Sequence, residues 1–330
     1  MPHSRGLRAI PPLVTAVAFA AVAAGVAWAS SPPVLLTRWG STGSGPGQFR
    51  LPTGVALDGA GNIYVADQNN RRVQKFTSSG AFLTTWSGPA TAPMSLPLGV
   101  AVDPAGDVYV VDSQAQRVQK FRADGTFLLQ IGSSGTTPGH FYTPWAVAAD
   151  GAGDVYVADE ALNNVQKFTS TGVYITQWGS PGSGDGQFSA PDGIAVDGEG
   201  NVYVADQDND RIQKFTSGGA FLRKWGVFGM GGCGELFHPG FIATDRGNHI
   251  YVVDSYNSRI QVFDGSGTCL TMWGSYGTGD GQFRYPSGIA VADNGTVYVA
   301  DPGTDSIQAF GLGAVEARTP TWGRLKTLYR

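Results

Sequence analysis

Apolar residues in this chain gather in short runs of four to six positions, separated by Gly, Asn, Asp and Pro. The runs are rich in Val, Ile, Tyr, Phe and Trp, which suit β-strands, and the separating residues suit tight turns. Most runs are continuously apolar, a pattern typical of strands buried on both faces, whereas a sheet with one solvated face alternates. The sequence is therefore predicted to be all-β.

The runs belong to a repeat. Tyr-Val-(Ala/Val)-Asp occurs six times, and successive copies start 45, 47, 47, 48 and 47 residues apart. Each copy follows a Pro with a short apolar run and a Gly-containing turn, and precedes a Val/Ile-Gln-x-Phe-type segment. Four short strands in about 40–50 residues are typical of one propeller blade. Six copies predict a six-bladed β-propeller with four antiparallel strands per blade.

The ends of the repeat predict how the ring closes. Five repeats carry an aromatic-Leu-x-x-Trp-Gly-type strand after the Phe, but the sixth ends at Phe310 without one in register. The missing copy lies at residues 35–40, Leu-Leu-Thr-Arg-Trp-Gly. We expect this N-terminal strand to complete the last blade, because closure removes two unpaired sheet edges.

Three regions are predicted: a signal peptide at 1–29, the propeller at 30–313 and a tail at 314–330. Arg5 and Arg8 precede an apolar stretch, and Ala27-Trp28-Ala29 fits a cleavage site. A signal peptide predicts export to the cell envelope or the medium. The alternative is that residues 1–29 stay uncleaved as a membrane anchor. No second apolar run in the sequence is long enough to span a membrane. The tail has the spacing of a short amphipathic helix, either docked on the rim or acting as a sorting tag.

Charge argues against a nucleic-acid partner. The formal charge is −4, and because two of the 22 basic residues lie in 1–29, the remainder has 20 basic and 26 acidic residues, a charge of −6. Proteins that bind phosphates rely on Lys and Arg. Lysines recur at one strand position in four repeats, where rim lysines with buried stems are expected: Lys75, Lys120, Lys167 and Lys214.

Two groups of residues invite a chemical interpretation. Cys233 and Cys269 either form a disulfide, as is common in exported proteins, or remain free. The repeated aspartates are predicted to be structural, because an Asp that ends a strand accepts hydrogen bonds from turn N–H groups. They are Asp67, Asp112, Asp159, Asp206, Asp254 and Asp301. A calcium loop at 206–210 lacks the required Gly and Glu, and no metal or other cofactor is expected.

These motifs resemble the NHL repeat over residues 35–310: Pro-x-Gly-(Val/Ile)-Ala-Val-Asp, Tyr-Val-Ala-Asp and Arg-(Val/Ile)-Gln-Lys-Phe. The resemblance implies the propeller fold, while NHL propellers include protein-binding, RNA-binding and enzymatic members. Zinc-dependent lyases of similar fold place His after the repeated Pro, where this chain has none. Its remaining histidines, His140, His238 and His249, fall at three different repeat positions, and none of its four Glu falls at a predicted channel-side position.

The residues that follow the repeated Pro are predicted to ring one mouth of the channel. They vary between blades, as recognition positions do: Thr53, Leu98, Trp145, Asp192, Gly240 and Ser287. An aromatic side chain beside the one acidic residue suits a sugar, a peptide or a cationic group, although Trp145 filling the channel is an alternative. The expected function is binding of a protein, peptide or glycan ligand by a monomer without catalysis. The alternatives are a metal-dependent lyase or lactonase-type hydrolase and an RNA-binding domain.

Overall fold

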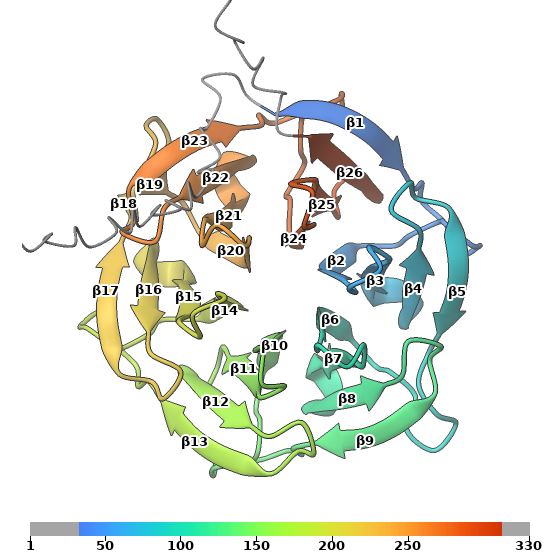
Figure 1. Ribbon diagram of the computed structural model, residues 1–330, viewed down its shortest axis with the longest axis horizontal. Helices are drawn as coiled ribbons and strands as arrows, with labels where there is room; N and C mark the ends of the chain where they lie inside the picture. The colour runs from blue at the N-terminus through green and yellow to red at the C-terminus, as the bar shows by residue number, and fades with distance from the viewer. Residues whose placement is uncertain (1–32, 312–330) are drawn as a thin grey trace, which may run out of the picture.

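Six blades surround a central channel in the computed structural model, which describes residues 33–311 (Figure 1). Each blade is one four-stranded antiparallel sheet, so the predicted fold is confirmed. The signal peptide predicted at 1–29 and the helix predicted at 314–330 lie outside the described residues. Within 33–311, no helix is long and apolar enough to cross a membrane.

The strands run outward from the channel in chain order within blades 1 to 5, whereas blade 6 has β1 as its outermost strand. Blade 1 holds β2 (Pro52–Leu57), β3 (Ile63–Asp67), β4 (Arg72–Phe76) and β5 (Phe82–Trp86). Blade 2 holds β6 (Pro97–Val102), β7 (Val108–Asp112), β8 (Arg117–Phe121) and β9 (Phe127–Ile131). Blade 3 holds β10 (Pro144–Ala149), β11 (Val155–Asp159), β12 (Asn164–Phe168) and β13 (Tyr174–Trp178).

The second half of the ring repeats this order. Blade 4 holds β14 (Pro191–Val196), β15 (Val202–Asp206), β16 (Arg211–Phe215) and β17 (Phe221–Trp225). Blade 5 holds β20 (Pro239–Thr244), β21 (Ile250–Asp254), β22 (Arg259–Phe263) and β23 (Cys269–Trp273). Blade 6 holds β24 (Ile289–Val291), β25 (Val297–Asp301), β26 (Ser306–Gly311) and β1 (Val34–Trp39).

A one-turn 3-10 helix follows the second strand in four blades and carries the chain to the third. These helices are η1 (Gln68–Asn70), η2 (Ser113–Ala115), η3 (Gln207–Asn209) and η4 (Ser255–Asn257). Each ends at a residue in the left-handed conformation, such as Arg71 with φ 56°. The turn places the residue after each repeated Asp at the same end of the blade as the repeated Pro, because Pro52 pairs with Asp67.

Closure occurs as the sequence predicts. β1 pairs antiparallel with β26, with Trp39 opposite Ile307 and Leu35 opposite Phe310. In Figure 1 the blue β1 forms the outer edge of the last, dark red blade. The first and last described strands therefore share one sheet, and blade 6 has four strands like the other blades.

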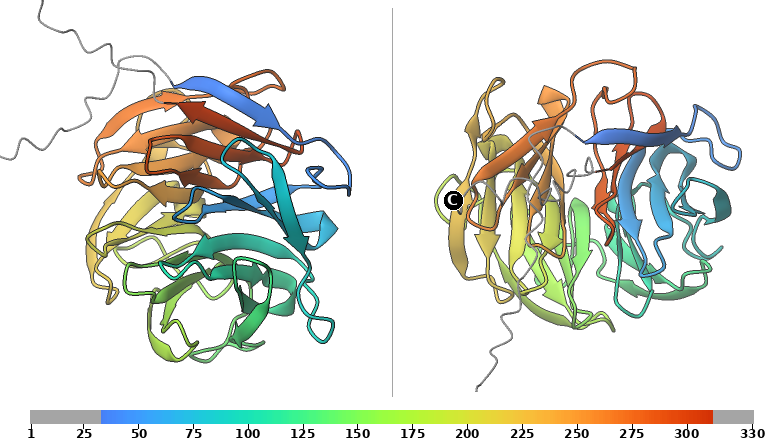
Figure 2. Two further views of the ribbon diagram at one scale, coloured as in Figure 1. Left: turned by 45° about the vertical axis from the view of Figure 1, so that its right-hand side comes forward. Right: turned by 45° about the horizontal axis from the view of Figure 1, so that its top comes forward.

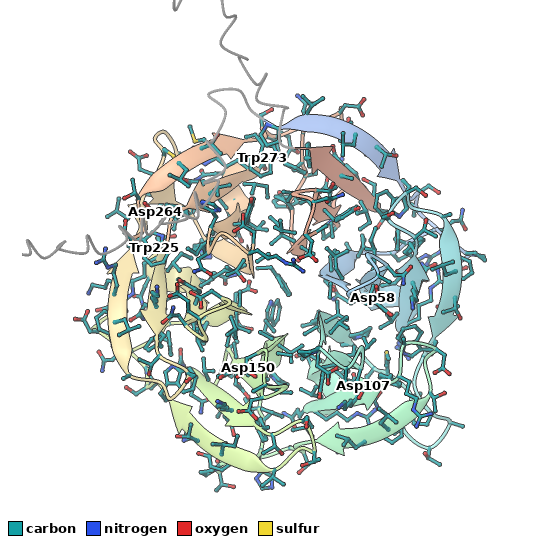
Figure 3. The ribbon with its side chains drawn as sticks, in the orientation of Figure 1. Asp58, Asp107, Asp150, Trp225, Asp264 and Trp273 are labelled. Atoms are coloured by element: carbon teal, nitrogen blue, oxygen red, sulfur yellow. A yellow bond between two sulfur atoms is a disulfide. The ribbon has the colours of Figure 1, made fainter. Side chains whose placement is uncertain are left out.

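Neighbouring blades pack face to face through aromatic side chains. Trp86 ends β5 and lies 6.1 Å from Tyr64 of its own blade and 6.0 Å from Phe121 of blade 2, measured between ring centroids. Trp225 and Trp273 occupy the matching outer strands in Figure 3. Since burying such a side chain stabilises the fold by about 1.5–3 kcal/mol, the core is spread around the ring, between the blades.

Blade 5 differs in the loop that precedes it. Here β18 (Val227–Phe228) and β19 (Glu235–Leu236) form a short parallel pair, labelled at the outer edge of the ring in Figure 1. Figure 2 shows the same ring from two further sides. Cys233 of this loop forms a disulfide with Cys269 of β23, with Cα atoms 5.8 Å apart. The sequence did not decide whether these two cysteines pair, and the structure shows that they do. The bond fixes the loop to the outer strand of its blade.

Candidate functional site

The repeated aspartates hold the blades together at one end. Asp67 is fully buried and accepts hydrogen bonds from the Arg50 backbone N–H at 2.8 Å and from Arg72 Nε at 2.7 Å. Gln74 Nε2 donates to the same carboxylate at 3.0 Å and to the Gln48 carbonyl at 2.7 Å. This Asp–Arg–Gln network ties the loop before the blade to its second and third strands, which explains the repeated Gln as well as the repeated Asp.

The four repeated lysines lie inside the scaffold. Lys75 Nζ lies 4.9 Å from the centroid of the Tyr64 ring and 3.5 Å from Asp58 Oδ2, and its side chain is 13% exposed. The same lysine–tyrosine pairing recurs in blades 2, 3 and 4. These side chains are engaged within four separate blades and do not form a continuous basic surface.

The variable residue after the repeated Pro is the second residue of each channel-lining strand, except Ser287, which precedes β24. Neighbouring strands touch at this level: a Cβ on Gly54 would lie 2.4 Å from the Leu98 carbonyl oxygen, and one on Gly288 would lie 2.0 Å from that of Thr53. The ring is narrow here, and only glycine allows this approach. We name this end of the channel, defined by residues 53, 98, 145, 192, 240 and 287, the proline mouth.

Asp192 is the most unusual residue of the proline mouth. It is 7% exposed, its Oδ2 accepts a hydrogen bond from Gln207 Nε2 at 2.7 Å, and its Oδ1 has no partner within 3.5 Å among the described residues. Burial raises the pKa of this carboxyl to about 8, the negative charge of Glu160 raises it further, and a longer hydrogen bond from the Trp145 side chain lowers it in part. Trp145 and Asp192 are therefore neighbours in the structure, and their role in binding stays a prediction.

Two residues of this site escaped the sequence analysis. Glu160 lies close enough to Asp192 to raise its pKa, so the expectation that no Glu lies on the channel side was wrong. Gln207 forms the hydrogen bond described above. Each directly follows a repeated Asp, and Pro191 pairs with Asp206 across β14 and β15. The position after the Asp therefore faces the position after the Pro, and this register was the signal that could have identified both.

The other residues of the proline mouth let neighbouring blades approach closely. Thr53 and Leu98 are buried, and the Thr53 hydroxyl donates to the Leu98 carbonyl at 3.1 Å. A Cβ on Gly240 would lie 2.8 Å from Ser255 Oγ and 3.7 Å from Asp192 Oδ2. Gly240 therefore lets Ser255 approach the buried carboxyl, and blades 3, 4 and 5 together form the polar side of the mouth.

The three aspartates between residues 206 and 210 have different partners and do not converge on one point. Asp206 pairs with Arg211 at 2.7 Å, Asp208 is exposed with His238 Nδ1 3.6 Å away, and Asp210 Oδ1 accepts the His238 backbone N–H at 2.8 Å. Within residues 33–311, no group of three or more His, Cys, Asp or Glu side chains is arranged to hold a metal ion. His249 contacts Asp245, at the opposite end of blade 5.

A second opening lies at the other end of the channel. A cavity of about 590 Å³ is lined there by the turns between first and second strands, including Asp58, Asp150, Arg246 and Asp293. Asp58 and Asp150 lie toward the channel in Figure 3. Each of these two carboxylates is occupied by its own turn and a tyrosine hydroxyl, whereas Arg246 and Asp293 form an exposed ion pair between blades 5 and 6. We name this end the turn mouth; the sequence did not single it out.

Curated relatives share a short segment with this chain. NHL repeat-containing protein 3 of Homo sapiens is 40% identical over 55 residues, a segment that covers 16% of this chain and 16% of the relative. The match spans less than two thirds of that protein, so it shows a similar repeat alone.

Solved structures share the fold over most of the chain. A gluconolactonase from Xanthomonas campestris has a TM-score of 0.61 at 16% identity, covering 86% of this chain and 96% of that one. A virginiamycin B lyase from Staphylococcus aureus has a TM-score of 0.58 at 15% identity, covering 85% and 98%. At such identities the likeness concerns the propeller alone.

The NHL repeat family matches the chain in five segments: 49–76, 94–121, 188–215, 238–263 and 283–310. These segments fall in blades 1, 2, 4, 5 and 6, while blade 3, which carries Trp145 and Glu160, is not among them. The unmatched blade has the same four strands as the others. Repeats, register and closure together make this chain an NHL-repeat protein with a six-bladed β-propeller.

Proposed function

We propose that this chain is an exported, monomeric propeller that binds a protein, peptide or carbohydrate ligand at the proline mouth and catalyses no reaction. The observation that carries the proposal is the buried Asp192 carboxyl, which lies beside the Trp145 side chain among mouth residues that differ from blade to blade. Positions that vary on a repeated scaffold are typical of recognition sites.

The surroundings of Asp192 suit recognition. Trp145 offers an aromatic surface, and Gln207 fixes the orientation of the carboxyl through its 2.7 Å hydrogen bond. A few fixed polar groups beside an aromatic wall are typical of ligand sites. The scaffold aspartates, by contrast, already have their partners, as Asp67 has in Arg72 and Gln74.

Glycan and peptide arrays test the proposal. We expect the full chain to bind a subset of either array and Trp145→Ala to bind about tenfold more weakly, because large aromatic contacts dominate such interfaces. Arg246→Ala is the matched control, since its side chain is 80% exposed at the turn mouth. It should bind as the unchanged protein does.

Three results contradict the proposal. Absence of any ligand on both arrays removes the binding function. Loss of binding in Arg246→Ala but not in Trp145→Ala moves the site to the turn mouth. Turnover of a lactone or of a cyclic peptide by the purified chain would replace binding with catalysis.

Export is the second part of the proposal and rests on the sequence of residues 1–29. N-terminal sequencing of the protein recovered from outside the cytoplasm should give Ser30 as the first residue. Recovery of the uncut chain from the cytoplasm alone would contradict export.

A further inference from the structure

Apolar side chains are exposed together on the loop that precedes blade 5 and on the turn beside it. Val227, Phe228 and Met230 of the loop and Tyr256 of η4 are each more than half exposed. Phe237, which follows β19, connects them, because its ring centroid lies 5.2 Å from that of Phe228 and 5.0 Å from that of Tyr256. We name these five residues the blade-5 patch. Contiguous apolar patches on a monomer often mark a binding surface.

The corresponding loop of another blade is polar. The loop before blade 5 reads Val-Phe-Gly-Met at 227–230, whereas the loop before blade 4 reads Ser-Pro-Gly-Ser at 180–183. In both loops the backbone N–H of this Gly donates to the carbonyl of the buried residue that ends the loop, Leu236 or Phe188, so the positions correspond. The scaffold therefore does not require the apolar side chains, and positions that vary on a repeated scaffold are typical of recognition.

The loop that carries the patch is held in place from two sides. The disulfide between Cys233 and Cys269 joins it to the outer strand of blade 5, and the N–H of Gly234 donates to Gln261 Oε1 at 2.8 Å. The parallel pairing of β18 with β19 fixes the backbone of Phe228. A partner that binds a loop ordered in advance loses less conformational entropy.

The size of the patch favours a short peptide over a second copy of this chain. A large aromatic side chain contributes about 150–250 Å² when it is buried, so the exposed parts of the five side chains offer on the order of 500 Å². A stable interface between two folded proteins buries about 800 Å² on each partner. The patch is smaller than a pair of copies needs, but it can cover the side chains of a short segment.

The spacing of the rings fits a polyproline II segment. The two steps from Phe228 to Phe237 and from Phe237 to Tyr256 together span at most about 10 Å. A polyproline II helix has three residues per turn and rises about 3.1 Å per residue, so prolines one turn apart lie about 9 Å apart on one side. Proline-rich segments pack on exposed aromatic rings in this way, and their preformed shape limits the entropy that binding costs.

A carboxylate borders the patch on the side of blade 4. The Asp208 side chain is 48% exposed, and its one ion-pair contact among the described residues is His238 Nδ1 at 3.6 Å. The His238 ring centroid lies 4.6 Å from that of Tyr256, which places this carboxylate next to the aromatic rings. A basic residue beside the prolines would complement it. The excess of acidic over basic residues in the chain disfavours an anionic lipid surface as the occupant.

We propose that the blade-5 patch binds a proline-rich segment of a partner protein, with prolines packed on Phe228, Phe237 and Tyr256 and a basic side chain directed to Asp208. The patch includes none of the residues that define the proline mouth. This interaction goes beyond the ligand binding proposed there and does not depend on it.

A peptide array tests the inference on the full chain. Its members are acetylated and amidated heptapeptides of the form x-Pro-Pro-x-Pro-Pro-x, in which x is every natural residue except Cys, beside the same set with glycine in place of each proline. The strongest binders should carry Arg or Lys at one end. Their glycine counterparts should bind about tenfold more weakly, because the aromatic contacts carry most of the affinity.

Calorimetric titration of the strongest binder measures the contribution of each side chain. Phe228→Ser and Tyr256→Ser should each weaken binding about tenfold, and Asp208→Asn should weaken it about threefold or more. Tyr142→Ser is the matched control, since Tyr142 of blade 3 is 55% exposed, close to the 57% of Tyr256. It should leave the affinity unchanged, and urea unfolding should show the same transition for all four variants.

Four results overturn the inference. The first is the absence of any binder on the array, and the second is equal binding of the proline and glycine sets. The third is peptide binding that survives both Phe228→Ser and Tyr256→Ser. The fourth is another occupant in place of the peptide, either a second copy, seen as self-association in sedimentation that Phe228→Ser abolishes, or a lipid surface, seen as flotation with phosphatidylcholine vesicles that the same variant abolishes.

Discussion

Arg38, in the first described strand, donates a hydrogen bond from Nε to Ser306 Oγ in the last at 3.1 Å, although 268 positions separate them. Ser306 stands where four blades carry the Arg that pairs with the repeated Asp. Arg38 lowers the pKa of Asp301, against the rise caused by burial. The N-terminal strand thus supplies blade 6 with both its fourth strand and its missing positive charge.

Closure by β1 should carry a measurable share of the stability. Trp39 lies 6.1 Å from Phe76 and 6.2 Å from Tyr298, measured between ring centroids, and so joins blades 1 and 6. Trp39→Ala is expected to lower the free energy of unfolding by about 2–3 kcal/mol, because the side chain is partly buried. Leu36→Ala on the same strand, 59% exposed, should cost about 0.5 kcal/mol or less. Equal costs in urea unfolding would argue against closure by β1.

The repeated Asp should matter most where it has an Arg partner. Asp206→Ala leaves Arg211 buried without its 2.7 Å partner, and breaking a buried ion pair in this way costs about 3–5 kcal/mol. In blade 3, Asp159→Ala removes hydrogen bonds but strands no Arg, and about 1–3 kcal/mol is expected. Urea unfolding of the two variants tests the difference, and a larger cost at Asp159 would contradict it.

Asp192 should make stability depend on pH. Its pKa is about 8 in the folded chain and about 3.9 when unfolded, so between these values the folded state holds a proton that the unfolded state has lost. Stability from this group is present below about pH 4 and falls as the pH rises to about 8. Asp192→Asn removes this dependence and should gain stability relative to the unchanged chain between pH 5 and pH 8.

Urea unfolding at pH 5 and at pH 8 measures the free energy of unfolding of Asp192→Asn and of the unchanged chain, and Asp293→Asn is the control. The control residue is exposed, and its difference from the unchanged chain should be the same at both pH values. A difference for Asp192→Asn that does not change with pH would show that the carboxyl is ionised throughout.

The disulfide should stabilise blade 5. Cys233 and Cys269 are 36 residues apart in sequence, and cross-linking a loop of this length stabilises a fold by about 3–4 kcal/mol in the chain-entropy description. Replacing both by Ser should lower the unfolding midpoint. Reductant should lower the midpoint of the unchanged chain equally and leave the double variant unaffected; a reductant effect on that variant would point to another cause.

Much of the fold could be predicted because each blade is encoded locally. The apolar runs, turn residues and six copies of Tyr-Val-(Ala/Val)-Asp repeat within about 50 residues, so strand number and blade number follow from spacing alone. Even closure was visible, since the fourth strand missing after Phe310 is present at residues 35–40. Trp145 and Asp192 could be singled out because the other blades have small or apolar residues at the same position.

The remaining features depended on which residues meet across strands and blades. Glu160 and Gln207 reach Asp192 only because strand pairing sets the end of one strand beside the start of another. Asn164 stands where four blades have Arg, and this difference affects Asp159 because that carboxylate is buried away from water in the folded blade. Local pattern determined the blades, since strands and turns depend on neighbours in sequence. Electrostatics and hydrogen bonding at the mouth depend on distance in space, which only the closed ring decided.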